Sequence, residues 1–306
     1  MITKVREGYK AFGLNISSEI PFPELLRMND LQVCNDVEVV IDPSFKEAFN
    51  LSPYEVIVDG EAVTMRLPDA GVFSIQNGNK IIVSPCAEAD EDVIRLYLLG
   101  TCMGIILIQR SIYPLHGSAV VINGNAYAFI GESGAGKSTL ASAFVGRGHK
   151  LVTDDIVPIS FLPAEHRPIV TPSYPQQKLW QQSLDAFGMN NAELRSIHGR
   201  ETKYCISVED KYYTDPIPLA GIFLLEKSDV DGINIQAVKK LERLPLLFQH
   251  TYRHFLIPKM NLVSWHFGFS SKLGERLPIY HLRRSENEFS APQLVDLILK
   301  TISLEE

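Results

Sequence analysis

A glycine-rich loop of the form G-x-x-x-x-G-K-[ST] constrains this chain more than any other feature. It reads Gly131-Glu132-Ser133-Gly134-Ala135-Gly136-Lys137-Ser138. The preceding segment, Ala126-Tyr127-Ala128-Phe129-Ile130, is typical of a buried strand, and the segment from roughly 137 to 147 has a helical apolar face. A loop of this composition between a strand and a helix predicts a phosphate-binding site.

The residue types in the loop suit an anion for separate physical reasons. Gly131, Gly134 and Gly136 can adopt backbone angles that side chains forbid, so amide N–H groups can turn toward a phosphate. The helix N-terminus adds partial positive charge. Lys137 is expected to reach the outer phosphates of ATP, and the Ser138 hydroxyl to bind a Mg²⁺ ion that bridges them. The residues expected to contact the nucleotide are Gly131, Glu132, Ser133, Gly134, Ala135, Gly136, Lys137, Ser138 and Thr139.

A second motif, His116-Gly117-Ser118, lies just upstream of an apolar strand at 119–122. Asn123-Gly124-Asn125 then indicates a hairpin into the strand that carries the glycine-rich loop. If Asn123 lies opposite Ala126, Ser118 is expected across from Gly131, and His116 beside the bound phosphates. The alternative is a histidine that ends a strand and hydrogen-bonds to the backbone.

Two adjacent carboxylates, Asp154 and Asp155, follow a short apolar strand at 151–153. Because Gly146 and Gly148 end the preceding helix, the strand, loop, helix and next strand are expected to form a βαβ unit with a right-handed crossover. Both carboxylates would then emerge at the same edge of a parallel sheet as the glycine-rich loop. One could hold magnesium and the other accept a proton from an attacking hydroxyl. The alternative is a simple turn.

Charge and apolar patterning exclude several partners. The formal net charge of −7 argues against nucleic acid as a binding partner, and Arg283-Arg284 is interpreted as solvated surface.

The four cysteines are not spaced like metal ligands and are interpreted as thiols of a reducing cytoplasm. The N-terminus shows no secretion signal. The apolar run at 96–108 is too short for a membrane span, which takes about 20 residues. We therefore expect a cytoplasmic protein that binds neither nucleic acid nor membrane. The cysteines are Cys34, Cys86, Cys102 and Cys205.

The pattern of elements changes near residue 88. Before it, short alternating segments separated by proline, Asp-Gly and Asn-Gly predict a small, mainly β domain over 1–88. A helix over 90–109, the glycine-rich loop, and mixed strands and helices follow, so 89–306 is expected to form an α/β domain. The predicted strands of the first domain are 11–16, 37–41, 54–58, 62–67, 71–76 and 80–83.

Three elements, in this order and spacing, resemble the catalytic core of HPr kinase/phosphorylase. They are His116-Gly117-Ser118, the loop 131–138 with Arg147-Gly148-His149 after it, and Asp154-Asp155. The resemblance implies an α/β P-loop kinase core of the HPr kinase/phosphoenolpyruvate carboxykinase type in 89–306. Segments 9–14, 18–25 and 172–180 are similar to HPr-kinase-like proteins found with lasso peptide biosynthesis, which phosphorylate the C-terminal serine of a precursor peptide.

The resemblance also implies roles for individual residues. Asp154 would be the base that deprotonates an acceptor serine, and Asp155 would help Ser138 to hold magnesium. His116 would support the acidic pair or the γ-phosphate, and Lys137 would bind the phosphates. Catalysis of this in-line transfer is mainly positioning and charge stabilisation.

The chain departs from the HPr enzymes in two segments. Residues 197–204 are at best a degenerate counterpart of their second glycine-rich signature, and 253–259 fit their later Pro-Gly-Arg loop poorly. These departures leave open whether HPr is the substrate and whether reverse phosphorolysis occurs. Arg200, Lys203 and Arg253 are the candidates for a further cation at the transition state. His250 and His254 are interpreted as packing or surface histidines rather than metal ligands.

The sequence therefore predicts an ATP- and Mg²⁺-dependent kinase that phosphorylates a serine in a peptide or small protein, with a lasso precursor as the favoured acceptor. One alternative is an HPr kinase/phosphorylase-type regulator or a kinase of a small hydroxylated molecule. Another, of a different class, is a nucleotide-binding regulatory module without transfer activity. The acidic pair argues against that module, because binding alone needs no base. Assembly into a homo-oligomer is left open.

Overall fold

The computed structural model describes residues 6–28, 35–162, 167–192, 194–197, 199–229, 232–286 and 288–304. The chain divides into two compact units, of which the first contains Met1–Pro114 and Arg253–Trp265 and the second Leu115–Tyr252 and His266–Glu306. Some sequence predictions fall outside the described residues. These are the first five residues, Cys34, His198 and the side chain of Arg200.

The first unit is built on an eight-stranded sheet with the order β3-β1-β2-β4-β8-β7-β6-β5. This confirms the β-rich N-terminal region. The predicted strand at 11–16 is wrong, because Phe12 and Gly13 have φ of 56° and 72° and form the turn of a hairpin in which Ala11 pairs with Leu14. The strands are β1 (Glu7–Ala11), β2 (Leu14–Ser18), β3 (Leu26–Arg27), β4 (Val37–Ile41), β5 (Val56–Asp59), β6 (Ala62–Leu67), β7 (Gly71–Gln76) and β8 (Lys80–Pro85), with a 3₁₀ turn η1 (Phe45–Ala48).

The apolar run after this sheet forms a buried helical stretch, as predicted. It consists of α1 (Glu91–Tyr97), the π-helical segment η2 (Leu98–Cys102) and α2 (Met103–Gln109). Asp90 caps it, because its side chain accepts a hydrogen bond from the Asp92 N–H at 2.8 Å. In the described part of the chain no helix is long and apolar enough to cross a membrane.

This helical stretch packs on the sheet before it. The Gln109 side chain accepts a hydrogen bond from the Gly78 N–H at 2.9 Å, and the Arg110 guanidinium donates to the Gly78 carbonyl at 3.1 Å. The compact units therefore do not divide at residue 88, where the sequence analysis put the domain boundary. Arg253 donates to Thr101 Oγ1 at 2.8 Å, within the same unit, which also holds α6 (Leu256–Lys259).

The second unit contains a sheet with the order β10-β9-β12-β13-β17-β19-β18, in which β10 also pairs with β17, and β11 with β9. Strand β9 lies between β10 and β11 and is antiparallel to both, so the expected all-parallel arrangement is wrong. Strands β10 and β11 nevertheless run in the same direction. The strands are β9 (Tyr113–Ile122), β10 (Asn125–Ile130), β11 (Leu151–Thr153), β12 (Ile156–Phe161), β13 (Pro168–Val170), β17 (Ile217–Ser228), β18 (Ile233–Ala237) and β19 (Ile279–Ser285).

The β9–β10 hairpin has the predicted turn but a different register. Asn123 and Gly124 have φ of 48° and 74°, which fits a two-residue hairpin turn, so Ile122 rather than Asn123 is the first paired residue. Ser118 consequently lies across from Phe129, not Gly131. The shift is two residues, and side chains alternate between faces with that period, so each side chain keeps its predicted face.

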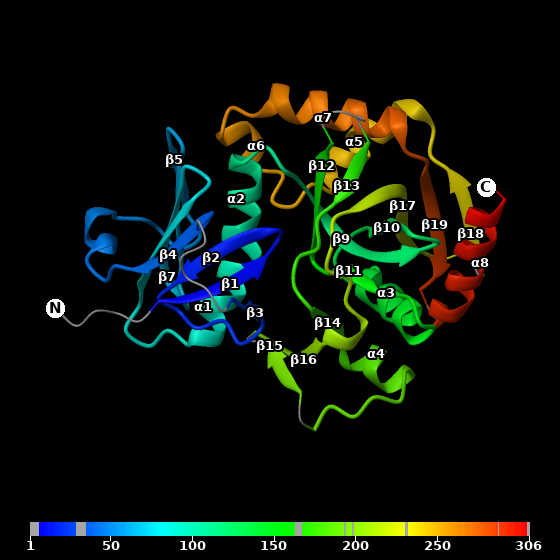
Figure 1. The fold of residues 1–306 in the computed structure, drawn as a ribbon, viewed down its shortest axis with the longest axis horizontal. Coiled ribbons are helices and arrows are strands. Elements are labelled where there is room, and N and C mark those ends of the chain that lie inside the picture. The colour runs from blue at the N-terminus through cyan, green and yellow to red at the C-terminus, as the bar shows by residue number, and fades with distance from the viewer. Residues whose placement is uncertain are drawn as a thin grey trace. The chain divides into compact units, whose positions relative to one another are not determined.

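Helices α3 (Lys137–Gly146) and α8 (Ala291–Ser303) pack side by side on this sheet (Figure 1). The rings of Phe129 on β10 and Phe144 on α3 stack at 5.3 Å, and Leu294 and Ile298 of α8 belong to the same buried cluster. This packing holds α3 against β10. The other helices are α4 (Gln181–Ala186), the 3₁₀ turn η3 (Glu209–Lys211), α5 (Lys240–Gln249) and α7 (Val263–Arg276).

A separate three-stranded antiparallel sheet has the order β14-β16-β15. Its strands are β14 (Gln176–Trp180), β15 (Arg195–Ile197) and β16 (Arg200–Ser207). Leu179 and Ile206 pack with Leu184 of α4 in a small apolar cluster. Because side chains alternate along a strand, Lys178 and Trp180 project to the side opposite Leu179.

Candidate functional site

The glycine-rich loop connects β10 to α3 as predicted from the sequence. Gly131, Gly134 and Gly136 all have positive φ, at 146°, 83° and 107°. A Cβ on Gly131 would lie 2.3 Å from the Leu225 carbonyl oxygen, so only glycine fits there. The loop conformation thus depends on both the backbone freedom and the small size of its glycines.

Lys137 is buried at the first position of α3. Its ammonium donates to the carbonyl oxygens of Gly131 at 2.8 Å and Glu132 at 3.0 Å. Burial lowers the pKa of Lys137, and the charges of Asp154 and Asp155 partly offset this. The ammonium therefore lies inside the loop, where a phosphate would sit.

The remaining loop residues differ in exposure. Glu132, Ser133 and Gly134 form an exposed rim, and the Glu132 carboxylate accepts a hydrogen bond from Gln249 Nε2 at 2.9 Å. Ala135 is buried. The Thr139 hydroxyl is 2.8 Å from the Ser183 hydroxyl on α4, so the Thr139 side chain anchors α3 to α4.

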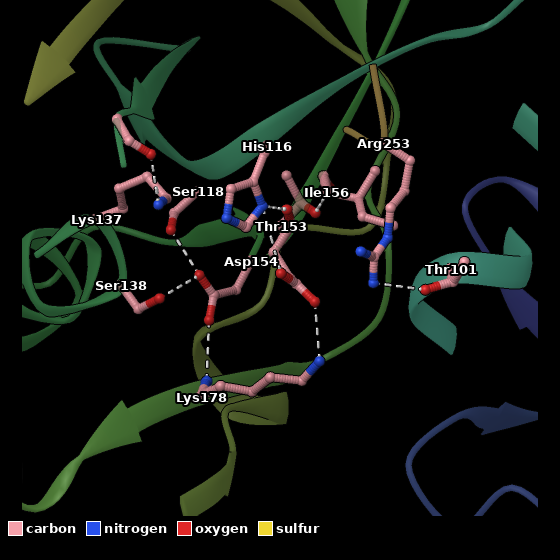
Figure 2. A network of polar contacts seen from close by, with 12 residues as sticks. Thr101, His116, Ser118, Lys137, Ser138, Thr153, Asp154, Ile156, Lys178 and Arg253 are labelled. Carbon is pink, nitrogen blue, oxygen red and sulfur yellow. Dashed lines mark hydrogen bonds and ion pairs between the residues drawn. The ribbon is translucent and has the colours of Figure 1, made fainter. Parts of the chain in front are cut away.

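Asp154 is a buried carboxylate held by three donors (Figure 2). Its Oδ1 accepts hydrogen bonds from the hydroxyls of Ser118 at 2.5 Å and Ser138 at 2.9 Å. Its Oδ2 accepts one from the Lys178 backbone N–H at 2.9 Å. The structure thus brings the predicted metal-binding serine, Ser138, to Asp154 and not to Asp155.

Asp155 lies beside Asp154 but in a different environment. It has a φ of 75°, and its side chain is 26% exposed. Its Oδ2 forms an ion pair with the Lys178 ammonium at 3.0 Å, and its Oδ1 lies 3.5 Å from His116 Nδ1. Burial raises the pKa of the Asp155 carboxyl, but Lys178 and then His116 lower it by more, so it lies well below its usual range. Asp155 is therefore ionised at neutral pH.

His116 lies next to the acidic pair, as the sequence analysis expected. Its Nδ1–H donates to the Asp155 carbonyl oxygen at 2.9 Å, so the alternative of a backbone-bonded histidine also holds. The ring packs against Tyr252 with centroids 5.6 Å apart. Burial is the main cause that lowers the pKa of His116, so the imidazole is neutral near pH 7.

A close backbone contact explains why the middle residue of the His-Gly-Ser motif, Gly117, is a glycine. A Cβ on Gly117 would lie 2.4 Å from the Phe129 carbonyl oxygen. Its N–H donates to the Asp155 carbonyl at 3.2 Å. His116 and Ser118 are two residues apart on β9 and so face the same side, where His116 contacts Asp155 and Ser118 contacts Asp154.

Lys178 is a site residue that the sequence analysis missed as a candidate for chemistry. It is buried in β14, and burial lowers its pKa while Asp155 raises it by more, so its pKa lies well above the ordinary value. Its backbone contacts Asp154 and its ammonium contacts Asp155 (Figure 2). A lysine inside an otherwise buried strand was the available signal, because buried lysines need a partner.

The interpretation of Arg283-Arg284 as solvated surface holds only for its first residue. Arg283 is exposed and pairs with Glu226 at 3.2 Å. Arg284 is partly buried, and its Nε donates to the Ala135 carbonyl of the glycine-rich loop at 3.0 Å. Alternation along β19 puts these two side chains on opposite faces.

Two of the three candidate cations can be placed. Lys203 of β16 lies opposite Trp180 of β14 in the sheet, and its ammonium is 5.5 Å from the centroid of the Trp180 ring. The charge of Lys203 contributes to lowering the pKa of Lys137 and that of Asp155. Arg253 belongs to the first unit, where it contacts Thr101.

His250 caps the end of α5, and His254 lies between α5 and α6, so the two histidines do not share a helix. Across the described ranges no group of three His, Cys, Asp or Glu residues could hold a metal ion.

Comparisons with known proteins match the part of the chain that carries this site. Residues 110–201, which include His116, the loop and the acidic pair, match the family model described as HPr Serine kinase C-terminal domain. This part of the chain is therefore similar to HPr kinases. The chain is 29% identical over 140 residues to the Putative HPr kinase/phosphorylase 2 of Oceanobacillus iheyensis, a match covering 43% of this chain and 44% of that protein.

It is also 37% identical over 86 residues to the HPr kinase/phosphorylase of Listeria monocytogenes, which covers 26% of this chain and 28% of that one. The chain spans less than half the length of these curated relatives. The solved Hpr(Ser) kinase/phosphatase from Coxiella burnetii is similar at 15% identity and a TM-score of 0.34, over 63% of this chain and 97% of that one.

Proposed function

We propose that this protein is an ATP- and Mg²⁺-dependent kinase that transfers the γ-phosphoryl group to a serine hydroxyl of a peptide or small protein. The observation that carries the proposal is the hydrogen bond from the loop hydroxyl of Ser138 to the buried Asp154, with a second, more exposed carboxylate, Asp155, directly beside it. This arrangement combines a phosphate-binding loop, oxygen ligands for a metal and a proton acceptor. The match to the HPr kinase domain supports the same reaction class.

The contacts favour exchanging the two aspartate roles that the family resemblance implied. Ser138 and Asp154 supply the hydroxyl and carboxylate oxygens that Mg²⁺ prefers, so they fit a nucleotide-bound magnesium ion. When bound, that ion would neutralise charge on the β- and γ-phosphates. Asp154 has its oxygens occupied by three donors and is buried. We therefore assign Asp154 to the metal side and Asp155 to the acceptor.

Asp155 would accept the proton of the serine hydroxyl as its oxygen attacks the γ-phosphorus. The new P–O bond forms while the bond between the γ-phosphorus and its bridging oxygen breaks, and ADP leaves. A strongly ionised carboxylate suits this step, because in a loose transition state the proton moves late and positioning dominates. Lys178 and His116 hold Asp155 in place, and Lys137 stabilises the phosphates.

The acceptor is proposed at the level of chemical class. HPr kinases act, by their name, on the protein HPr, and a serine-terminated lasso precursor remains the acceptor proposed from segments 9–14, 18–25 and 172–180. A kinase of small hydroxylated molecules and a non-catalytic nucleotide-binding module are the other candidates. The ion-paired Asp155 beside the loop supports a catalyst over the module.

The experiment that tests the proposal measures transfer of label from γ-labelled ATP to each acceptor. It uses the Asp154→Asn and Asp155→Asn variants, with Asp185→Asn, at an exposed position of α4, as the control. We expect Asp155→Asn to lower kcat with little change in the magnesium requirement, and Asp154→Asn to raise the magnesium requirement. Asp185→Asn should match the unmodified protein. Undiminished transfer by both site variants would refute the mechanism.

A further inference from the structure

Arg284 lies against the glycine-rich loop from the side opposite the acidic pair. Its Nε donates to the Ala135 carbonyl at 3.0 Å, and its Nη1 donates to the Ser285 carbonyl at 3.0 Å. Its Nη2 would lie 3.5 Å from a Cβ built on Gly136. Among the described residues, its hydrogen bonds go to backbone carbonyls only, which leaves donors of a rigid, planar guanidinium available beside the loop.

The sheet places Arg284 and the acidic pair on two different sides of the loop. Strand β10 pairs with β9 on one side and with β17 on the other. Asp154 and Asp155 follow β11, which pairs with β9. Arg284 is on β19, which pairs in parallel with β17 and extends beyond the end of β10. The loop is therefore flanked by carboxylates on one side and by an arginine on the other.

This asymmetry orients a bound triphosphate. Under the proposed function, the γ-phosphate must lie toward Asp155, because the acceptor hydroxyl attacks from there. The chain of phosphates then leads away from β9, so the ribose and base lie toward the carboxyl ends of β17 and β19. Ligands of open α/β sheets bind beyond the carboxyl ends of the strands.

We propose that Arg284 binds the nucleoside part of ATP, by stacking on the base or by hydrogen bonding to the ribose. The guanidinium suits this role because it is planar, stacks on aromatic rings and keeps donors in its own plane. Its contact with Ala135 fixes it relative to the loop, and so relative to the phosphates. The inference rests on the proposed function only for the direction of the triphosphate.

The test compares ATP with inorganic tripolyphosphate, which has the phosphates but no nucleoside. Binding of each ligand with Mg²⁺ is measured by isothermal titration calorimetry for the unmodified protein, Arg284→Ala and Arg284→Gln. Arg283→Ala is the matched control, since Arg283 is the adjacent, exposed arginine on the opposite face. Arg284→Gln keeps a polar side chain against the loop and replaces Arg284→Ala if that variant does not fold.

We expect either Arg284 variant to weaken ATP binding about tenfold, and tripolyphosphate binding by less than about twofold. Arg283→Ala should leave both affinities unchanged. Equal losses for the two ligands would show that Arg284 only supports the loop, and an unchanged ATP affinity would show that it only lies at the surface. Either result overturns this inference alone. Selective loss of ATP affinity in a protein that phosphorylates no serine would instead refute the proposed function and leave this inference standing.

Discussion

Replacing Lys178 with methionine tests whether the ion pair with Asp155 organises the site. The change removes the ammonium 3.0 Å from Asp155 Oδ2 but keeps the backbone N–H that binds Asp154. At that distance the Coulomb attraction is about 5 kcal/mol for an effective dielectric constant of about 20. Desolvation of the buried lysine and screening at the partly exposed Asp155 offset most of it. We expect a net coupling of about 2 kcal/mol.

A double-mutant cycle measures this coupling. The free energy of unfolding in urea is determined for the unmodified protein, Lys178→Met, Asp155→Asn and the double variant. The matched control is a cycle of Lys227→Met with Glu286→Gln, an exposed ion pair at 3.6 Å, which should couple by less than about 0.5 kcal/mol. Lys178→Met should also lower kcat for phosphoryl transfer about a hundredfold, because Asp155 loses its position.

A coupling between Lys178 and Asp155 no larger than that of the control pair would refute the reasoning. The ion pair would then contribute nothing beyond an exposed contact, and the low pKa of Asp155 would lack its stated cause.

Three further predictions each concern one residue at or near the site. Gly117→Ala should destabilise folding by about 2 kcal/mol or more in urea unfolding, because its Cβ would meet the Phe129 carbonyl at 2.4 Å. Gly146→Ala, with open space around it in α3, is the control, and equal losses would contradict the account. His116 should titrate below pH 6.5 by NMR in the nucleotide-free protein, because burial disfavours its charged form; a midpoint at or above 6.5 would show that the carboxylates dominate. Ser138→Ala should raise the Mg²⁺ concentration needed for half-maximal transfer about tenfold, and an unchanged requirement would remove that hydroxyl from the metal site.

The strand-loop-helix unit was predictable because its signals are local. One short stretch of sequence holds the apolar strand, the glycines that can adopt positive φ and the lysine that begins the helix. The hairpin between β9 and β10 was predictable as well, since Asn123-Gly124 favours its turn. The two-residue shift in register was not, because the residues flanking such a turn can pair in more than one way.

Lys178 and Arg284 could not be assigned from the sequence because their roles depend on distant partners. Lys178 reaches Asp155 only once β14 has packed beside α3, and Arg284 reaches Ala135 only once β19 has paired with β17. The compact units divide elsewhere than at the predicted boundary for a related reason. The contact of Gly78 with Gln109 and Arg110 joins segments on either side of residue 88, where the pattern of predicted elements changes.

The most direct test of the central claim is tandem mass spectrometry of acceptors incubated with this protein, ATP and Mg²⁺. HPr and a serine-terminated lasso precursor are tested in parallel, with the Asp155→Asn variant as the comparison. The account predicts phosphoserine on an acceptor with the unmodified protein and its near absence with Asp155→Asn. Equal phosphorylation by the two proteins, or ATP binding with phosphate on neither acceptor nor on a wider set of serine peptides, would contradict the account.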